Sequence, residues 1–130
     1  MKYLLDTHAV LWWLFDDPGL PGPVRQVMAD PNNRILVSSA SAWEIATKHR
    51  LGKLNAADVL VQDIAGWVEK SGFEELCVTI EHAQRAGAWH HDHRDPFDRM
   101  LAAQSAIESV PLITKDRVFL SFGISTFWVQ

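Results

Sequence analysis

The sequence predicts an α/β fold in which a parallel sheet carries helices on both faces. Short apolar segments alternate along the chain with longer segments that begin at helix-capping residues. The short segments contain few polar residues, as expected of strands that are buried on both faces. No internal repeat, charge block or Ser/Gly-rich linker divides the 130 residues, so one domain is expected, and the length is ordinary for one.

The first half of the chain predicts two strands and four helices. The sequence Asp-Asp-Pro-Gly ends the first helix, because proline and glycine seldom continue one. Ser41 and Glu44 have the spacing of a capping box, which predicts a helix start, and Asn55 is expected to cap the helix that follows. The expected strands are residues 2–6 and 34–38, and the expected helices are residues 8–15, 21–30, 41–51 and 55–71.

The second half predicts three strands and two helices. Asp95 and Pro96 form a strong helix start, since aspartate caps free N–H groups and proline suits the first helical position. Cys77 lies in an expected strand and is interpreted as a small buried side chain. The expected strands are residues 75–79, 111–114 and 124–129, and the expected helices are residues 80–87 and 95–109, joined by a polar loop at 88–94.

Composition and charge exclude several classes of protein. Apolar residues make up 48% of the chain, which excludes disorder, and the single cysteine excludes a disulfide framework and a thiolate zinc site. With a net charge of −4, any phosphate substrate must be met by local positive groups or by bound metal. The apolar run at residues 9–15 is far shorter than the ~20 residues of a membrane span. A soluble, cytoplasmic protein is expected.

Four acidic side chains are predicted to lie at one edge of the sheet. Every strand of a parallel sheet ends at the same edge, and the helix that follows it begins there. Taken singly, each acid is also well explained as a helix cap, but capping does not explain why all four recur at one edge. The four are Asp6, Glu44, Asp98 and Asp116.

Carboxylates gathered in this way predict a divalent cation. Four negative charges would repel one another, and some would take up protons unless a cation joined them. Carboxylate oxygens are ligands that Mg²⁺ and Mn²⁺ prefer.

The motifs around these acids resemble the PIN-domain family, and in particular the VapC-type toxins of bacterial toxin–antitoxin pairs. The motifs stand in the family's order, and the resemblance spans residues 2–129. They are LLDTH at residues 4–8, WEI at 43–45, FDRMLAAQ at 97–104 and LITKD at 112–116.

The resemblance implies a fold, an activity and partners. The fold would be a three-layer PIN-like fold with strand order 3-2-1-4-5. The activity would be hydrolysis of RNA phosphodiester bonds, with one or two Mg²⁺ or Mn²⁺ ions held by the four acids. An antitoxin protein would neutralise the enzyme, which would form a homodimer. Two alternatives stay open: a housekeeping RNA-processing nuclease of the same family, and a non-catalytic PIN domain that binds protein.

The resemblance favours Asp98 over Asp95 as the third acid of the site. The family's third acid precedes an Ala-Ala pair by four residues, as Asp98 does here. Asp95 is then the helix cap, although it shares a helical face with Asp98 and stays open as a contact of a metal-bound water. Thr7 and Thr114 each adjoin a key acid and either hold a carboxylate or water in place or cap a helix.

Basic side chains near the acids are candidates for contact with RNA. Lys48 can instead pair with Glu44 on a solvated helix face, and Arg99 with Asp95, because both pairs have i, i+4 spacing. Three histidines in the 88–94 loop suggest zinc only weakly, since they lack the spacing of helical zinc motifs. The RNA-contact candidates are Arg94, Arg99, Lys115, Arg117 and Lys48.

The first expected helix is apolar around its whole circumference. Seven successive apolar residues, 9–15, cover every side of a helix, whereas one face of a sheet can bury only part of it. Either Phe15 and residues 21–30 fold over the exposed side, or Trp12 or Trp13 lies at an interface with an antitoxin or a second subunit.

Overall fold

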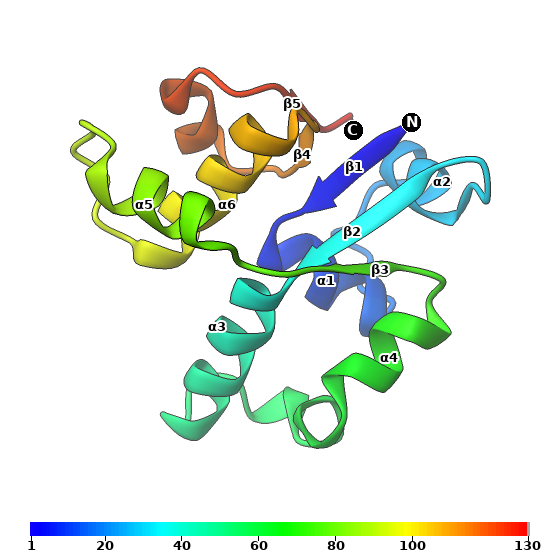
Figure 1. The fold of residues 1–130 in the computed structure, drawn as a ribbon. Coiled ribbons are helices and arrows are strands. Elements are labelled where there is room, and N and C mark those ends of the chain that lie inside the picture. The colour runs from blue at the N-terminus through cyan, green and yellow to red at the C-terminus, as the bar shows by residue number, and fades with distance from the viewer. Residues whose placement is uncertain (130) are drawn as a thin grey trace.

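The computed structural model describes residues 1–129, and its centre is a five-stranded parallel sheet (Figure 1). The strand order is β3-β2-β1-β4-β5, and every neighbouring pair is parallel. The predicted fold class and the strand order implied by the resemblance are therefore confirmed. The strands are β1 (Lys2–Leu5), β2 (Arg34–Ser38), β3 (Glu74–Leu76), β4 (Leu112–Ile113) and β5 (Thr126–Phe127).

Helices cover both faces of the sheet (Figure 1). Helix α6 packs on one face and α5 packs against α6, whereas α1, α2 and α4 lie on the other face. The helices are α1 (Thr7–Leu14), α2 (Gly22–Ala29), α3 (Ser39–Arg50), α4 (Ile64–Lys70), α5 (Ile80–Ala88) and α6 (Pro96–Glu108), with 3-10 turns η1 (Asn55–Ala57), η2 (Leu60–Gln62) and η3 (Arg117–Phe122). Among residues 1–129, no helix is long and apolar enough to cross a membrane.

Two hydrophobic clusters fill the layers on either side of the sheet. Successive side chains of a strand point to opposite faces, so Leu4 and Leu5 of β1 enter different clusters. Leu4 packs with α6 and η3, and Leu5 packs with α1, α2 and α4. Both leucines are fully buried, which places β1 at the centre of the molecule.

The third helix begins earlier than the capping-box spacing predicts. Ser38, the last residue of β2, is the N-cap, and its hydroxyl accepts a hydrogen bond from the backbone N–H of Ala40 at 3.0 Å. The strand passes into α3 without a loop, so the capping box at Ser41 is not used. Glu44 therefore lies in the second turn of α3, and its predicted place in the first turn is wrong.

The predicted helix over residues 55–71 is also wrong. Asn55 begins the short turn η1, and α4 starts only after Asp63, whose carboxylate accepts a hydrogen bond from the N–H of Gly66 at 3.0 Å. Cys77 is exposed rather than buried. The strand ends at Leu76, because the chain leaves the sheet edge for Thr79 to cap α5.

The cap of α4 gives a direct test of this corrected boundary. Asp63→Ala removes a side-chain cap and should lower the free energy of unfolding by about 1 kcal/mol. Asn55→Ala should change it by less than about 0.5 kcal/mol, because Asn55 makes no cap hydrogen bond with its side chain. Urea denaturation of both variants measures the difference. Equal losses would contradict the boundary described here.

Candidate functional site

The four predicted acids lie at the carboxyl edge of the sheet. Asp6 follows β1 and caps α1, and Asp116 follows the neighbouring strand β4 and caps η3. Glu44 lies on α3, which follows β2, and Asp98 lies in the first turn of α6. The charge of Asp98 acts on Asp6, and the charge of Glu44 acts on Asp98. Asp116 joins these acids through Thr114 and through a cavity that it shares with Asp6.

Asp6 is a deeply buried acid at the centre of this edge. Only 5% of the residue is exposed, and both carboxylate oxygens accept hydrogen bonds. Oδ1 accepts from the backbone N–H of Ala9 at 2.7 Å, and Oδ2 accepts from the Thr114 hydroxyl at 2.5 Å. Burial raises the pKa of Asp6 from 3.8 to about 6, against the lowering effect of these hydrogen bonds, and the negative charge of Asp98 adds to the rise.

Thr114 joins Asp6 to Asp116. Its hydroxyl group donates a hydrogen bond to Asp6 Oδ2, and the same hydroxyl oxygen accepts one from the backbone N–H of Asp116 at 3.0 Å. Asp116 is exposed, and its Oδ1 accepts from the N–H of Val118 at 3.0 Å. The two carboxylates line a cavity of about 240 Å³ together with His8, Trp12 and Lys115.

Glu44 is held by side chains from two helices. It is 5% exposed, and its Oε1 accepts a hydrogen bond from the Thr7 hydroxyl at 2.6 Å. The same hydroxyl lies 3.0 Å from Ser41 Oγ. Lys48 donates to Glu44 Oε2 at 2.5 Å, which confirms the predicted i, i+4 pair. Thr7 thus adjoins Asp6 in sequence but positions Glu44.

Asp95 and Asp98 have different roles in α6. Asp95 is the N-cap, and its Oδ1 accepts from the backbone N–H groups of Phe97 at 2.9 Å and Asp98 at 3.1 Å. Asp98 instead points its Oδ2 at His93 Nε2, 2.8 Å away. Burial raises the pKa of Asp98, and the charges of Asp95 and Glu44 raise it further, whereas His93 lowers it.

The chemistry of this donor set fits a divalent cation. The side chains are hard oxygen donors, and two of them have raised pKa values because burial and neighbouring negative charge disfavour ionisation. Within residues 1–129, no three His, Cys, Asp or Glu side chains stand close enough to form a ready-made metal cage. Mg²⁺ does not require such a cage, because it keeps several waters and binds through one or two carboxylates.

The structure gives Arg99 a role that the sequence did not predict. Its guanidinium donates to the backbone carbonyls of four residues at the end of α5 and in the 88–94 loop, and its expected ion pair with Asp95 does not form. The side chain therefore holds that loop against α6. The four carbonyls belong to Ala86, Trp89, His91 and His93.

Two histidines of the 88–94 loop have structural partners. His91 stacks on Phe122, with 3.8 Å between ring centroids, and its Nε2 lies 2.8 Å from Ser121 Oγ. His93 contacts Asp98, as described above. Sequence reasoning treated these histidines as a weak zinc motif and missed the contact of His93 with the acidic cluster, because only the folded loop brings them together.

The remaining basic candidates adjoin Asp95 and Asp116 in sequence. Arg94, Lys115 and Arg117 are exposed, so their charges are free to meet phosphate groups. The Lys115 ammonium lies 5.9 Å from the ring centroid of Trp12, at the rim of the small cavity.

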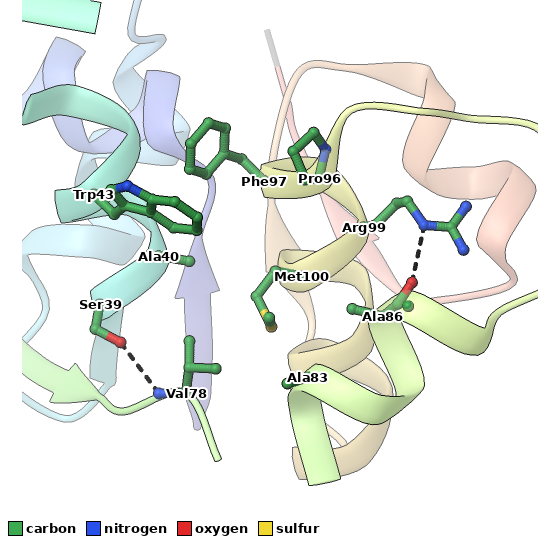
Figure 2. A pocket seen from close by; sticks show the side chains of 11 residues that line it. Ser39, Ala40, Trp43, Val78, Ala83, Ala86, Pro96, Phe97, Arg99 and Met100 are labelled. Carbon is green, nitrogen blue, oxygen red and sulfur yellow. Dashed lines mark hydrogen bonds between the residues drawn. The ribbon is translucent and has the colours of Figure 1, made fainter. Parts of the chain in front are cut away.

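Figure 2 shows an apolar pocket of about 390 Å³ beside the acids, between α3 and the pair α5 and α6. Trp43 and Phe97 face each other there, with 5.0 Å between ring centroids, and Met100 points into the pocket. Trp43 is 65% exposed and precedes Glu44, whereas Phe97 precedes Asp98. Sequence reasoning did not find this pocket, because its walls lie far apart in the chain.

Helix α1 is covered in part by its own chain. Trp12 packs on Trp128, with 5.9 Å between ring centroids, and Trp13 packs on Phe73 at 5.2 Å. Residues of α2 join the same cluster, as the self-covering alternative expected, and Phe15 stays exposed. Neither Trp12 nor Trp13 is fully buried, so an intermolecular contact of one of them stays a prediction.

Comparison with known proteins identifies the family. The family model for the PIN domain matches residues 3–124, nearly the whole chain. This chain belongs to the PIN-domain family. A curated relative, ribonuclease VapC16 of Mycobacterium tuberculosis, is 37% identical over 62 residues, which cover 48% of this chain and 43% of the relative. The chain thus matches less than half the length of that relative.

Solved structures share the PIN fold of this chain over its length. The structure of VapBC2 from Rickettsia felis, bound to a promoter DNA fragment, has a TM-score of 0.71 at 17% identity and covers 97% of this chain and 96% of its own. The Mycobacterium tuberculosis toxin VapC20, described as cleaving the sarcin–ricin loop, has a TM-score of 0.67 at 18% identity. The match covers 98% of this chain and 99% of the VapC20 chain. At these identities the likeness concerns the fold.

The raised pKa of Asp6 predicts how stability depends on pH without metal. The folded state binds the Asp6 proton more tightly than the unfolded state, so stability rises as the pH falls through about 6. From about pH 7 to pH 5 this carboxyl should add roughly 1 kcal/mol to the free energy of unfolding. Asp6→Asn should lack that gain while it keeps an acceptor for Ala9 and a polar partner for Thr114.

Urea denaturation in EDTA at both pH values measures this difference. The comparison between wild type and Asp6→Asn cancels the titration of the histidines, which both proteins share. Parallel pH dependence in the two proteins would show that burial does not raise the pKa of Asp6.

Proposed function

We propose that this chain is a divalent-metal-dependent endoribonuclease that hydrolyses RNA phosphodiester bonds, and that it is the toxin of a toxin–antitoxin pair. The observation that carries the proposal is the position of Asp6, Glu44, Asp98 and Asp116 at the carboxyl edge of a PIN-domain sheet, where Asp98 interacts with Asp6 and Glu44, and Thr114 links Asp6 to Asp116. The partial similarity to a protein named ribonuclease VapC16, and the fold shared with VapBC structures, support it.

In this proposal the carboxylate cluster holds one or two Mg²⁺ or Mn²⁺ ions. Such an ion supplies Lewis acidity, which lowers the pKa of water and offsets the charge that develops on phosphate. The hydroxyls of Thr7 and Thr114 orient Glu44 and Asp6, and His93 orients Asp98.

Positive side chains around the cluster would bind the RNA backbone. The net charge of −4 makes binding by the whole surface unfavourable, so local groups must supply the attraction. Arg94, Lys115 and Arg117 are exposed and suit this role. Arg99 is engaged with four backbone carbonyls and acts instead by holding the loop that carries His93.

We also propose that the protein acts in the cytoplasm as one nuclease domain, forms a homodimer and binds an antitoxin. These points rest on the resemblance to VapC-type toxins and on the half-buried aromatic side chains of α1. The antitoxin is expected to be encoded by a short reading frame that adjoins this gene.

Removal of one acid at a time tests the nuclease proposal. Asp98→Asn should lower the rate of RNA cleavage in saturating Mn²⁺ by at least about a hundredfold, because ligands affect activity more than their supporting residues do. Asp95→Asn is the matched control, since asparagine can keep the cap of α6, and should retain activity within about tenfold. EDTA should abolish cleavage by every variant. A wild-type protein that does not cleave RNA in Mn²⁺ would overturn the proposed function.

The partner surface on α1 has a separate test. Trp13→Glu should weaken binding of the protein encoded by the adjoining reading frame by at least about tenfold, because a charge cannot replace a buried aromatic anchor. RNA cleavage should persist, since Trp13 does not line the cavity of Asp6 and Asp116. The matched control is Leu120→Glu, an exposed apolar side chain on η3 at the other face of the sheet. Unchanged binding by a folded Trp13→Glu protein would remove this surface from consideration.

A further inference from the structure

Lys48 places a positive charge inside the acidic cluster. It lies one helical turn after Glu44 on α3, and its Nζ is 2.5 Å from Glu44 Oε2. The side chain of Glu44 is 6% exposed and that of Lys48 is 43% exposed, so the ion pair lies half beneath the surface. A pair in this position is screened by water less than a pair on an open surface.

Both oxygens of the Glu44 carboxylate already have donors. Thr7, on α1, donates to Oε1, and Lys48 donates to Oε2. The two donors come from different helices, Thr7 from α1 and Lys48 from α3. A cation that bound Glu44 directly would have to displace the ammonium group or lie beside it against its repulsion.

The ammonium group also acts on two other acids. The hydrogen bond with Glu44 raises the pKa of Lys48, and the negative charges of Glu44, Asp95 and Asp98 raise it further. Lys48 therefore stays protonated and offsets part of the negative charge on this side of the cluster.

The other three acids of the site have no such partner. Asp6 accepts only from a hydroxyl and a backbone N–H, and Asp116 accepts from a backbone N–H. Asp98 contacts His93. In the part of the chain that the structure describes, no lysine or arginine forms an ion pair with any of the three.

We propose that Lys48 serves as a resident cation for Glu44, so that the site takes one divalent ion, which Asp6, Asp98 and Asp116 hold directly or through its waters, and not two. The inference rests on the proposed metal-dependent function and specifies it. Glu44 then has an indirect role, in which it holds Lys48 beside the ion and not the ion itself.

Titration of the purified full chain with Mn²⁺ tests the proposal, with stoichiometry and Kd read by calorimetry and by electron paramagnetic resonance of free Mn²⁺. Wild type should bind one ion. Lys48→Met, which removes the charge and keeps an unbranched side chain one atom shorter, should bind a second ion. Lys48→Arg should bind one. Lys53→Met removes the same charge from an exposed side chain just after α3, and should bind one ion with the wild-type Kd.

A second pair of variants tests the same proposal if Lys48→Met does not fold. Glu44→Gln removes the negative charge but keeps one oxygen that can accept from Lys48 and an amide N–H that can donate to the Thr7 hydroxyl. It should change the Kd for Mn²⁺ by no more than about threefold. Asp98→Asn should weaken it by at least about tenfold, which corresponds to about 1.4 kcal/mol.

Each contrary outcome has a distinct meaning. Two ions in the wild type, or a Glu44→Gln protein that loses Mn²⁺ as Asp98→Asn does, would overturn the role of Lys48 and leave the nuclease proposal in place. No binding of Mn²⁺ by the wild type would overturn the proposed metal-dependent function together with this inference.

Discussion

Crowding of negative charge at the carboxyl edge of the sheet is the constraint on which the site depends. Asp6 is buried at the end of the central strand, and the charge of Asp98 reaches it from another helix. Burial and repulsion both disfavour its ionised form and raise its pKa. A cation at this edge would offset the negative charge and favour the ionised carboxylate. The electrostatic repulsion that is unfavourable in the metal-free protein therefore suits this edge to bind a metal ion.

The fold reduces this electrostatic repulsion because several of the acids also serve as helix caps. Asp6, Asp95 and Asp116 each cap a helix or 3-10 turn, so each carboxylate accepts backbone N–H groups at a positive helix end. Thr114 adds a hydroxyl donor that joins Asp6 to Asp116 without adding charge. Neutral donors of this kind hold a carboxylate in place and leave its charge available to a cation.

On the side of the cluster formed by α3 and α6, basic side chains contact the acids directly. Lys48 pairs with Glu44, and His93 contacts Asp98 from a loop that Arg99 fastens to the backbone. The cluster is therefore asymmetric, with Asp6 and Asp116 held by neutral donors and Glu44 held by an ammonium group. This asymmetry is the physical basis for expecting a single metal ion.

The sequence by itself determined the fold class, the family and the four acids at one edge, because these depend on local patterns: apolar strands, helix starts and short motifs at fixed positions. The i, i+4 pair of Glu44 and Lys48 was also predictable, since it lies within one helix. Tertiary structure alone decided which donors reach each acid. Thr7 bonds to Glu44 and not to the adjacent Asp6, and Arg99 turns from Asp95 to the carbonyls of a distant loop. These hydrogen-bond partners depend on how elements far apart in the sequence pack together, and a local sequence pattern contains no information about that packing.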